Sequence, residues 1–140
     1  FLRCGNYFER DGQFLYTPPV HSMLAFRQAL LELEAEGGVA AREARYRRNH
    51  RVLVHGMRAL GFRTYLPDAL QSPIITTFLP PSGEDFDFNR FYDRVEERGY
   101  VIYSGKVLHE LTFRIATIGR IFEADVRNLL GAIRDVMAER

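Results

Sequence analysis

The sequence of 140 residues contains one cysteine, one lysine and no tryptophan. Because Cys4 has no second cysteine to pair with, an internal disulfide and a zinc site built from several cysteines are excluded. A reaction that needs a lysine amine has only Lys106 to draw on, since arginine stays protonated. No apolar run approaches the ~20 residues of a membrane-spanning helix. These absences favour a protein of a reducing, cytoplasmic setting.

The overall composition is that of an ordinary globular chain, with 46% hydrophobic, 13% aromatic and 26% charged residues. The formal net charge is +1, which is too balanced for a dedicated nucleic-acid or membrane-surface protein. We therefore expect no nucleic-acid partner and no membrane partner. The length favours one domain.

Periodic patterns divide the chain into three segments. Residues 1–21 are predicted to form an irregular or extended lead-in, and residues 22–60 a two-helix connection broken at Gly37-Gly38. Apolar residues three or four positions apart, and runs of β-branched and aromatic residues, predict the following helices and strands: helices 22–36, 39–60, 87–98 and 123–138; strands 62–66, 74–79, 101–103 and 112–115. Residues 104–111 are predicted to form a loop.

The segment 61–140 therefore has the order β-β-α-β-β-α. The economical packing of such a segment is an α+β fold, with a small, mostly antiparallel sheet covered by helices on one face. Asp87 is the predicted N-cap of the third helix.

Two apparent motifs depart from the consensus sequences that they resemble. The segment 99–107 resembles a phosphate-binding P-loop, but it has one residue too many between its glycines, and Val107 stands where a serine or threonine should bind magnesium. His109-Glu110 begins like a zinc-protease helix, but Phe113 replaces the second histidine ligand. We therefore predict no metal site and assign no catalytic residue.

The helix 39–60 is strongly basic. Its arginines could contact phosphates, but they are spread around much of the helix, so a solvated or subunit-facing helix is the simpler interpretation. They are Arg42, Arg45, Arg47, Arg48 and Arg51.

Two features remain as candidate binding groups. Thr17-Pro18-Pro19 precedes a helix, and a hydroxyl on a stiff backbone near helical N–H groups suits a phosphate. The plain alternative is a helix N-terminal cap and a change of chain direction. Arg114 lies among apolar residues of a predicted strand, so it needs either an internal carboxylate or an anionic ligand.

Separate motifs, in order along the chain, resemble the carboxyl-terminal part of the 2-aminoethylphosphonate:pyruvate transaminases. These enzymes are class V, fold-type I pyridoxal-phosphate aminotransferases, and the resemblance runs from about Phe8 to the end of the chain. The matching segments are 16–26 (YTPPVHSMLAF), 72–78 (SPIITTF), 98–103 (RGYVIY) with Gly105-Lys106, and 113–115 (FRI) leading to Ile118-Gly119.

The resemblance implies specific roles. Thr17 would reach the phosphate of the pyridoxal 5'-phosphate cofactor in the neighbouring subunit of a homodimer, and Arg114 would hold the anionic group of a small substrate, either a phosphonate or a 2-oxo acid. The family's reaction moves an amino group from 2-aminoethylphosphonate to pyruvate, giving phosphonoacetaldehyde and alanine. The family's cofactor domain, with its Schiff-base lysine, lies outside these residues, and Lys106 matches a different family position.

The departures from the family lie beside Arg114. Ala116-Thr117 stands where relatives usually have Gly-Asn, and Ser104 where they usually have proline. Because the cofactor domain is missing, we expect this chain alone to be inactive and to bind no cofactor by itself. Its partner would be a second copy or a complementing cofactor-domain fragment. Two alternatives stay open: a non-catalytic dimerisation or interaction module, and a fragment of an alanine–glyoxylate or serine-type class V aminotransferase.

Overall fold

A computed structural model describes residues 2–81, 86–107 and 110–139 of the chain. The chain divides into two compact units, Phe1–Arg42 and Glu43–Arg140. The boundary lies inside a long helix and so falls within the predicted two-helix connection 22–60. Across the described ranges, no helix is both long enough and apolar enough to cross a bilayer.

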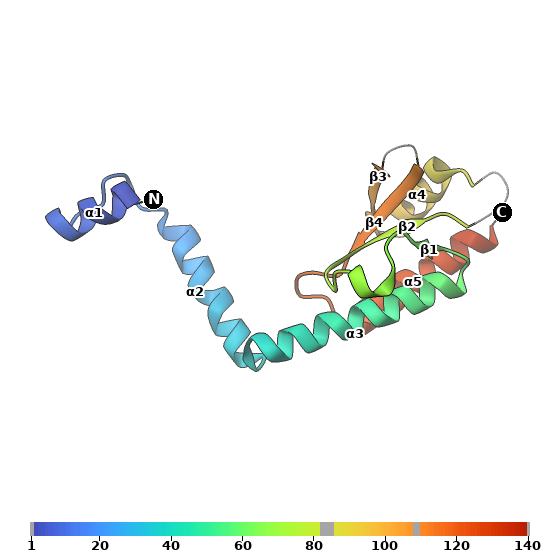
Figure 1. The fold of residues 1–140 in the computed structure, drawn as a ribbon, viewed down its shortest axis with the longest axis horizontal. Coiled ribbons are helices and arrows are strands. Elements are labelled where there is room, and N and C mark those ends of the chain that lie inside the picture. The colour runs from blue at the N-terminus through green and yellow to red at the C-terminus, as the bar shows by residue number, and fades with distance from the viewer. Residues whose placement is uncertain (1, 82–85, 108–109, 140) are drawn as a thin grey trace. The chain divides into compact units, whose positions relative to one another are not determined.

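The first unit begins with helix α1 (Leu2–Asp11) (Figure 1). The expectation of an irregular or extended lead-in over residues 1–21 is therefore wrong for its first half. The rings of Phe8 and Phe14 lie 5.1 Å apart, and the N–H of Gly12 donates to the carbonyl of Phe8 at 2.8 Å, which closes the helix end. This local packing stabilises a helix that the mixed aromatic and charged composition did not reveal.

Helix α2 (Val20–Ala35) follows the two prolines and contains no buried residue. It is separated from helix α3 (Gly38–Ala59) at the predicted Gly37-Gly38 break. Gly37 has φ +103°, a left-handed conformation that residues with a Cβ rarely adopt. The two helices 22–36 and 39–60 predicted from the sequence are thus confirmed to within a few residues.

The second unit contains one antiparallel sheet with strand order β1-β2-β4-β3. Its strands are β1 (Arg63–Thr64), β2 (Ile75–Leu79), β3 (Tyr103–Val107) and β4 (Glu110–Ala116), with a short 3-10 turn, η1 (Asp68–Leu70), between β1 and β2. Together with helices α4 (Phe88–Glu97) and α5 (Glu123–Ala138), the order β-β-α-β-β-α is confirmed.

The strand β3 corrects one expectation. The sequence placed a strand at 101–103 and a loop at 104–111, whereas β3 begins where that strand was expected to end and pairs with β4 from Tyr103↔Arg114 to Val107↔Glu110. Serine, glycine and lysine have low strand propensity, so the local pattern concealed this hairpin. Its backbone hydrogen bonds to β4 override that propensity.

The capping of α4 agrees with the sequence. The Asp87 carboxylate accepts hydrogen bonds from the N–H groups of Asn89, at 2.9 Å, and Arg90, at 3.1 Å. These bonds satisfy two amides that the first helical turn leaves without partners. The helix then places Phe88, Phe91 and Val95 in the core.

The core of the second unit lies on one side of the sheet, under α3, α4 and α5 (Figure 1). Phe113 of β4 is fully buried, and its ring centroid lies 5.5 Å from those of Phe62 and Phe91 and 5.8 Å from that of Phe78. Helices α3 and α5 approach closely at Gly56, where an added Cβ would lie 2.4 Å from Cδ1 of Leu130. The opposite side of the sheet carries no described helix of this unit.

Candidate functional site

Arg114 lies on the uncovered face of the sheet, on strand β4 between β2 and β3. Side chains alternate between the two faces of a strand, and Phe113 faces the core, so Arg114 lies on the opposite face. Its cross-strand partners are Thr77 on β2 and Tyr103 on β3. This open face is the place where a small ligand can meet the guanidinium.

Arg114 is exposed rather than buried between apolar neighbours. The sequence expectation of a costly buried charge is therefore wrong, because the apolar residues that flank it point to the other face. Within the described parts of the chain, no carboxylate forms an ion pair with Arg114. The alternative of an ordinary internal ion pair thus finds no partner there, and the guanidinium is available to an external anion.

Strand β3, which pairs with the strand that carries Arg114, has no side chain at Gly105. A Cβ added to Gly105 would lie 3.2 Å from Nη2 and 3.3 Å from Nε of Arg114, so the guanidinium rests close to the backbone of β3. The buried hydroxyl of Thr112 donates to the Gly105 carbonyl at 3.0 Å, which fixes this part of β3 against β4. Sequence reasoning assigned no role to Gly105, although a glycine in a strand often marks a close approach.

Side chains of α3 form hydrogen bonds with the backbone of the turn after β4. Nη1 of Arg45 donates to the carbonyls of Gly119, at 2.8 Å, and Ile121, at 2.7 Å. The amide of Asn49 also donates to Ile121 at 2.8 Å, and the Tyr46 hydroxyl accepts from the Gly119 N–H at 3.3 Å. The end of the strand that carries Arg114 is therefore anchored to a helix of the core.

Arg45 differs from the solvated or phosphate-binding arginine that the sequence suggested. Its exposed fraction is 7%, and its guanidinium lies 5.0 Å from the ring centroid of Tyr46 and 5.1 Å from that of Phe122. The signal in the sequence was the spacing of four between Arg45, Asn49 and Leu53, which continues the buried stripe of the helix. A polar residue on such a stripe indicates a structural hydrogen-bonding role.

Other arginines of this helix form ion pairs close to it. Nε of Arg42 lies 2.8 Å from the Glu36 carboxylate, and Nη2 of Arg47 lies 2.7 Å from the Glu43 carboxylate. These pairs agree with the simpler interpretation of a helix whose charges face solvent. They give no support to a nucleic-acid site.

Thr117, one of the departures from the family, lies in the same anchored turn. Its exposed fraction is 2%, its hydroxyl donates to the Pro73 carbonyl at 3.0 Å, and its N–H donates to the Ile74 carbonyl at 2.9 Å. The threonine therefore ties the end of β4 to the start of β2. Its side chain serves the sheet and does not face the open surface.

A cavity of about 340 Å³ opens beside the same end of the sheet. Its walls come mainly from apolar residues of β3, β4 and α5, with Tyr103, Ala116 and Ile118 at the strand ends and Leu129 on the helix. The carboxylate of Asp125, which also lines it, accepts from the Phe122 N–H at 2.8 Å and so serves as a helix cap. The cavity offers apolar surface but no charged group free of a structural task.

Thr17 lies in the first unit, in the extended stretch before α2, and its side chain is exposed. The capping alternative is wrong: Pro19 is the N-cap of α2, no side chain caps that helix, and the first bonds are made by the carbonyls of Pro18 and Pro19. The hydroxyl of Thr17 makes no hydrogen bond to any residue in the described ranges. Thr17 and Arg114 belong to different units, and each is placed only within its own.

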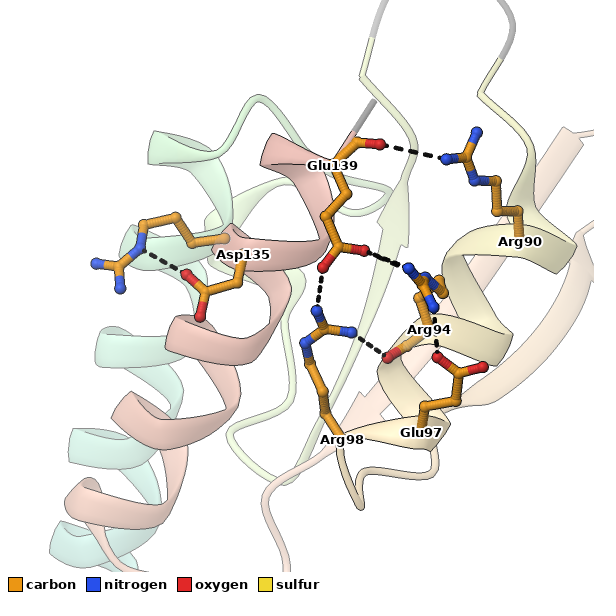
Figure 2. Close-up of polar contacts among 7 residues, drawn as sticks. Arg90, Arg94, Glu97, Arg98, Asp135 and Glu139 are labelled. Atoms are coloured by element: carbon orange, nitrogen blue, oxygen red, sulfur yellow. Dashed lines mark hydrogen bonds and ion pairs between the residues drawn. The ribbon is translucent and has the colours of Figure 1, made fainter.

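A cluster of arginines on α4 joins that helix to the end of α5 (Figure 2). The Glu139 carboxylate accepts from Nε of Arg94 at 3.1 Å and pairs with Arg98, while the Glu139 carbonyl accepts from Arg90 at 3.2 Å. Arg94 also pairs with Glu97 at 2.8 Å. These arginines have partners on the helices and therefore fasten α4 to α5.

The described residues include no group of three or more histidine, cysteine, aspartate or glutamate side chains that could hold a metal ion. For the pyridoxal phosphate that the resemblance implies, the described residues offer a candidate contact only to the phosphate group. Thr17 fits that group in one respect, since it offers a hydroxyl that no described residue uses. Lys106 lies in β3 opposite Leu111.

Comparison with known proteins gives a consistent result. No protein-family model matches the chain. A 2-aminoethylphosphonate–pyruvate transaminase of Syntrophobacter fumaroxidans is 54% identical over 128 residues, which cover 91% of this chain and 34% of that protein. The corresponding transaminase of Salmonella paratyphi B is 53% identical over 129 residues, or 92% of this chain and 35% of that protein.

Solved structures of aminotransferases share the fold. Alanine–glyoxylate aminotransferase from Nostoc sp. superposes with a TM-score of 0.82 at 23% identity, over 94% of this chain and 35% of that one. Pyridoxamine–pyruvate aminotransferase from Mesorhizobium loti gives a TM-score of 0.76 at 27% identity, over 93% and 33%. The chain thus spans about a third of the length of the curated relatives it matches. In sequence it is related to the carboxyl-terminal part of the 2-aminoethylphosphonate–pyruvate transaminases, and in fold to other aminotransferases.

Proposed function

We propose that this chain is the carboxyl-terminal portion of a 2-aminoethylphosphonate:pyruvate transaminase. In this role it supplies Arg114 as the receptor for the substrate's anionic group and Thr17 as a contact to the cofactor phosphate of a neighbouring subunit. The observation that carries the proposal is the exposed guanidinium of Arg114 on the uncovered face of the sheet, with no carboxylate partner among the described residues.

Arg114 suits both halves of the reaction. The donor, 2-aminoethylphosphonate, ends in a phosphonate, and the acceptor, pyruvate, ends in a carboxylate. A guanidinium binds oxygens of either group through parallel N–H donors, and it stays protonated over the whole physiological pH range. The same side chain can therefore bind and orient each substrate in turn.

Pyridoxal phosphate, when bound, supplies the carbonyl that accepts the amino group and the ring that withdraws electrons from the reacting carbon. This chain contributes binding and orientation. Thr17, on a backbone stiffened by the two following prolines, would donate one hydrogen bond to the phosphate, and Arg114 would fix the far end of the substrate. The product pair is phosphonoacetaldehyde and alanine.

Alanine formation from 2-aminoethylphosphonate and pyruvate tests the proposal. The chain with added pyridoxal phosphate should give no turnover above the cofactor in buffer, because the lysine and the pyridine partner of the cofactor domain are needed for chemistry. A protein that joins this chain to a cofactor domain of one of the curated relatives should be active. Turnover by the chain alone, or no turnover by the joined protein, would contradict the proposal.

In the joined protein, Arg114→Ala should lower kcat/KM by tenfold to a hundredfold, since a charged hydrogen bond contributes about 1.5–3 kcal/mol. Arg114→Lys should retain part of the binding. The matched control is Arg134→Ala, which changes an exposed arginine on α5 whose one ion pair among the described residues is with the neighbouring Asp135 at 3.5 Å. This variant should leave kcat/KM unchanged. An equal effect of both alanine variants would remove the assignment of Arg114.

Another class V activity remains the second enzymatic candidate, because the carboxylates of alanine, serine and glyoxylate also suit Arg114. The joined protein separates these activities by its donor. Faster amino transfer to pyruvate from 2-aminoethylphosphonate than from serine supports the phosphonate assignment. The reverse order, or faster transfer from alanine to glyoxylate, supports the alternative.

A dimerisation or interaction module is favoured by one separate observation. Helix α2 has no buried residue, and Met23, Leu24 and Phe26 are 53%, 59% and 66% exposed. An apolar helix in this state gains free energy by association with a second copy or with a complementing cofactor-domain fragment. Such association is compatible with the catalytic proposal, in which a subunit neighbour is required.

A further inference from the structure

We propose that Gly105 is a positioning residue for Arg114, because the absence of a side chain there lets the Nε–Nη2 edge of the guanidinium lie close to the backbone of β3. This inference rests on the proposed function, since it assigns the geometry of the anion receptor. It assigns a role to a glycine that the matching segments contain but to which they give none. The residue acts through Arg114 and does not itself touch the substrate.

The backbone does not require glycine at position 105. Gly105 is not among the glycines with positive φ, and it lies inside a regular antiparallel pairing, opposite Thr112. Glycine in a strand interior costs backbone entropy and provides no side chain to pack. A reason outside the backbone must therefore account for it.

The side chain of Arg114 occupies the space beside the missing Cβ of Gly105. The three heavy atoms nearest to an added Cβ all belong to the head of Arg114: Nη2 at 3.2 Å, Nε at 3.3 Å and Cζ at 3.7 Å. The Nε–Nη2 edge of the guanidinium therefore faces the place of the missing Cβ. Two of these separations are tighter than ordinary van der Waals contact, so any side chain at this position would displace the head by a few tenths of an ångström.

Neighbouring contacts hold Gly105 and the strand that carries Arg114 in place. Arg114 and Gly105 lie on paired strands, and the Thr112 hydroxyl fixes the Gly105 carbonyl at 3.0 Å. Arg45 anchors the turn that follows β4. A guanidinium seated on a fixed strand loses less conformational entropy when it binds an anion than a free one does, which favours affinity.

The experiment compares Gly105→Ala with Gly131→Ala in the joined protein. Gly131 lies in α5, does not have a positive φ, and has no atom within 4 Å of an added Cβ, so it is the matched control for the same chemical change. We expect Gly105→Ala to raise KM for both 2-aminoethylphosphonate and pyruvate by about tenfold with kcat changed less than about twofold. Gly131→Ala should change neither.

A double-mutant cycle separates positioning from a general structural effect. In an Arg114→Ala background, Gly105→Ala should have no further effect on KM, because no guanidinium remains to be displaced. If Gly105→Ala raises KM by the same factor in both backgrounds, or behaves like Gly131→Ala, the inference is overturned. If Arg114→Ala itself leaves KM unchanged, the proposed function fails instead.

A measurement on the unmodified 140-residue chain keeps the inference testable even if Gly105→Ala does not fold. The ¹⁵N heteronuclear NOE of the Arg114 Nε–Hε group should be clearly higher than that of Arg134, whose side chain is 70% exposed. Equal mobility of the two side chains would contradict the inference that Gly105 positions the Arg114 guanidinium. This readout does not depend on transaminase activity.

Discussion

At the scale of single residues, two arginines that look alike in the sequence have opposite roles. Arg45 is buried and donates to backbone carbonyls, whereas Arg114 is exposed and has no carboxylate partner among the described residues. The difference follows from the face on which each lies. The spacing to Leu53 places Arg45 on the core side of α3, and alternation with Phe113 places Arg114 on the open side of the sheet.

Arg45→Met tests the buried role, because methionine keeps much of the apolar stem and removes the guanidinium. The carbonyls of Gly119 and Ile121 would lose charged donors, so the free energy of unfolding should fall by about 2–4 kcal/mol. Arg48→Met, at an exposed position of the same helix, should change it by less than about 0.5 kcal/mol. Urea unfolding of both variants measures the difference, and equal values would contradict this role.

The ion pair between Arg58 and Asp68 predicts a pH effect. The hydrogen bond from Arg58 lowers the pKa of the Asp68 carboxyl, and the charge of His50 adds to the shift. Because the pKa is lower in the folded state, the pair stabilises the fold above about pH 4, the unfolded value, and this contribution is lost as the pH falls through the folded pKa.

Arg58→Met should therefore return the pKa of Asp68 toward its ordinary value. The carboxyl ¹³C resonance of Asp68, followed over a pH titration, measures the pKa directly. Arg134→Met, which removes an arginine of α5 that pairs with Asp135, should leave the Asp68 titration unchanged. The idea is wrong if Asp68 titrates at the same pH in the parent chain and in the Arg58 variant.

At the scale of elements, the contact of α3 with α5 depends on Gly56. A Cβ there would lie 2.4 Å from Cδ1 of Leu130, so Gly56→Leu must push the helices apart or force Leu130 into another rotamer. We expect a loss of about 1–3 kcal/mol in the free energy of unfolding. Gly131→Ala, in open space on α5, should instead stabilise by about 0.5–1 kcal/mol.

Thermal or urea unfolding of both glycine variants checks the sign of each effect. If the Gly56→Leu variant is as stable as the parent, then α3 and α5 accommodate the larger side chain without loss of unfolding free energy, and the prediction is wrong. A destabilising Gly131→Ala would show that this helix position is more crowded than the structure indicates.

The elements also show what the sequence could and could not predict. Asp87, the Gly37 break and the apolar stripes placed α2 to α5 correctly, because capping, backbone freedom and periodicity are local properties. The β3 strand escaped because its stability comes from pairing with β4, which Ser104-Gly105-Lys106 does not signal. Helix α1 escaped because its support is the packing of Phe8 on Phe14.

The candidate site was predictable in part. The strand context singled out Arg114, and the rigid Thr-Pro-Pro stretch singled out Thr17, although the capping alternative for Thr17 proved wrong. The exposure of Arg114 and its contact with Gly105 depend on the register between β3 and β4, which no local pattern encodes. The roles of Thr17 and Arg114 in binding stay predictions.

At the scale of the whole molecule, the exposed apolar residues of α2 predict self-association. The mass in solution, measured by light scattering over a concentration series, should exceed that of one chain. Leu24→Glu combined with Phe26→Glu should shift it toward the monomer, because the charges oppose burial of that face. Leu70→Glu, at a residue of η1 that is 69% exposed, is the control and should have no effect.

A parent chain that stays monomeric at high concentration would contradict this expectation. An equal shift by the Leu70 variant would instead point to a general effect of added charge. The same measurement repeated with a cofactor-domain fragment distinguishes a second copy from that fragment as the occupant of α2.

The hairpin of β3 and β4 has a consequence for the order of folding. Consecutive antiparallel strands meet after closure of a short loop, and isolated hairpins form in about 1–10 μs, whereas pairing of β2 with β4 must first bring together distant parts of the chain. The guanidinium of Arg114 and the glycine at its edge therefore belong to one local hairpin. We expect the proposed anion receptor to form early, before the slower long-range pairing of β2 with β4 is complete.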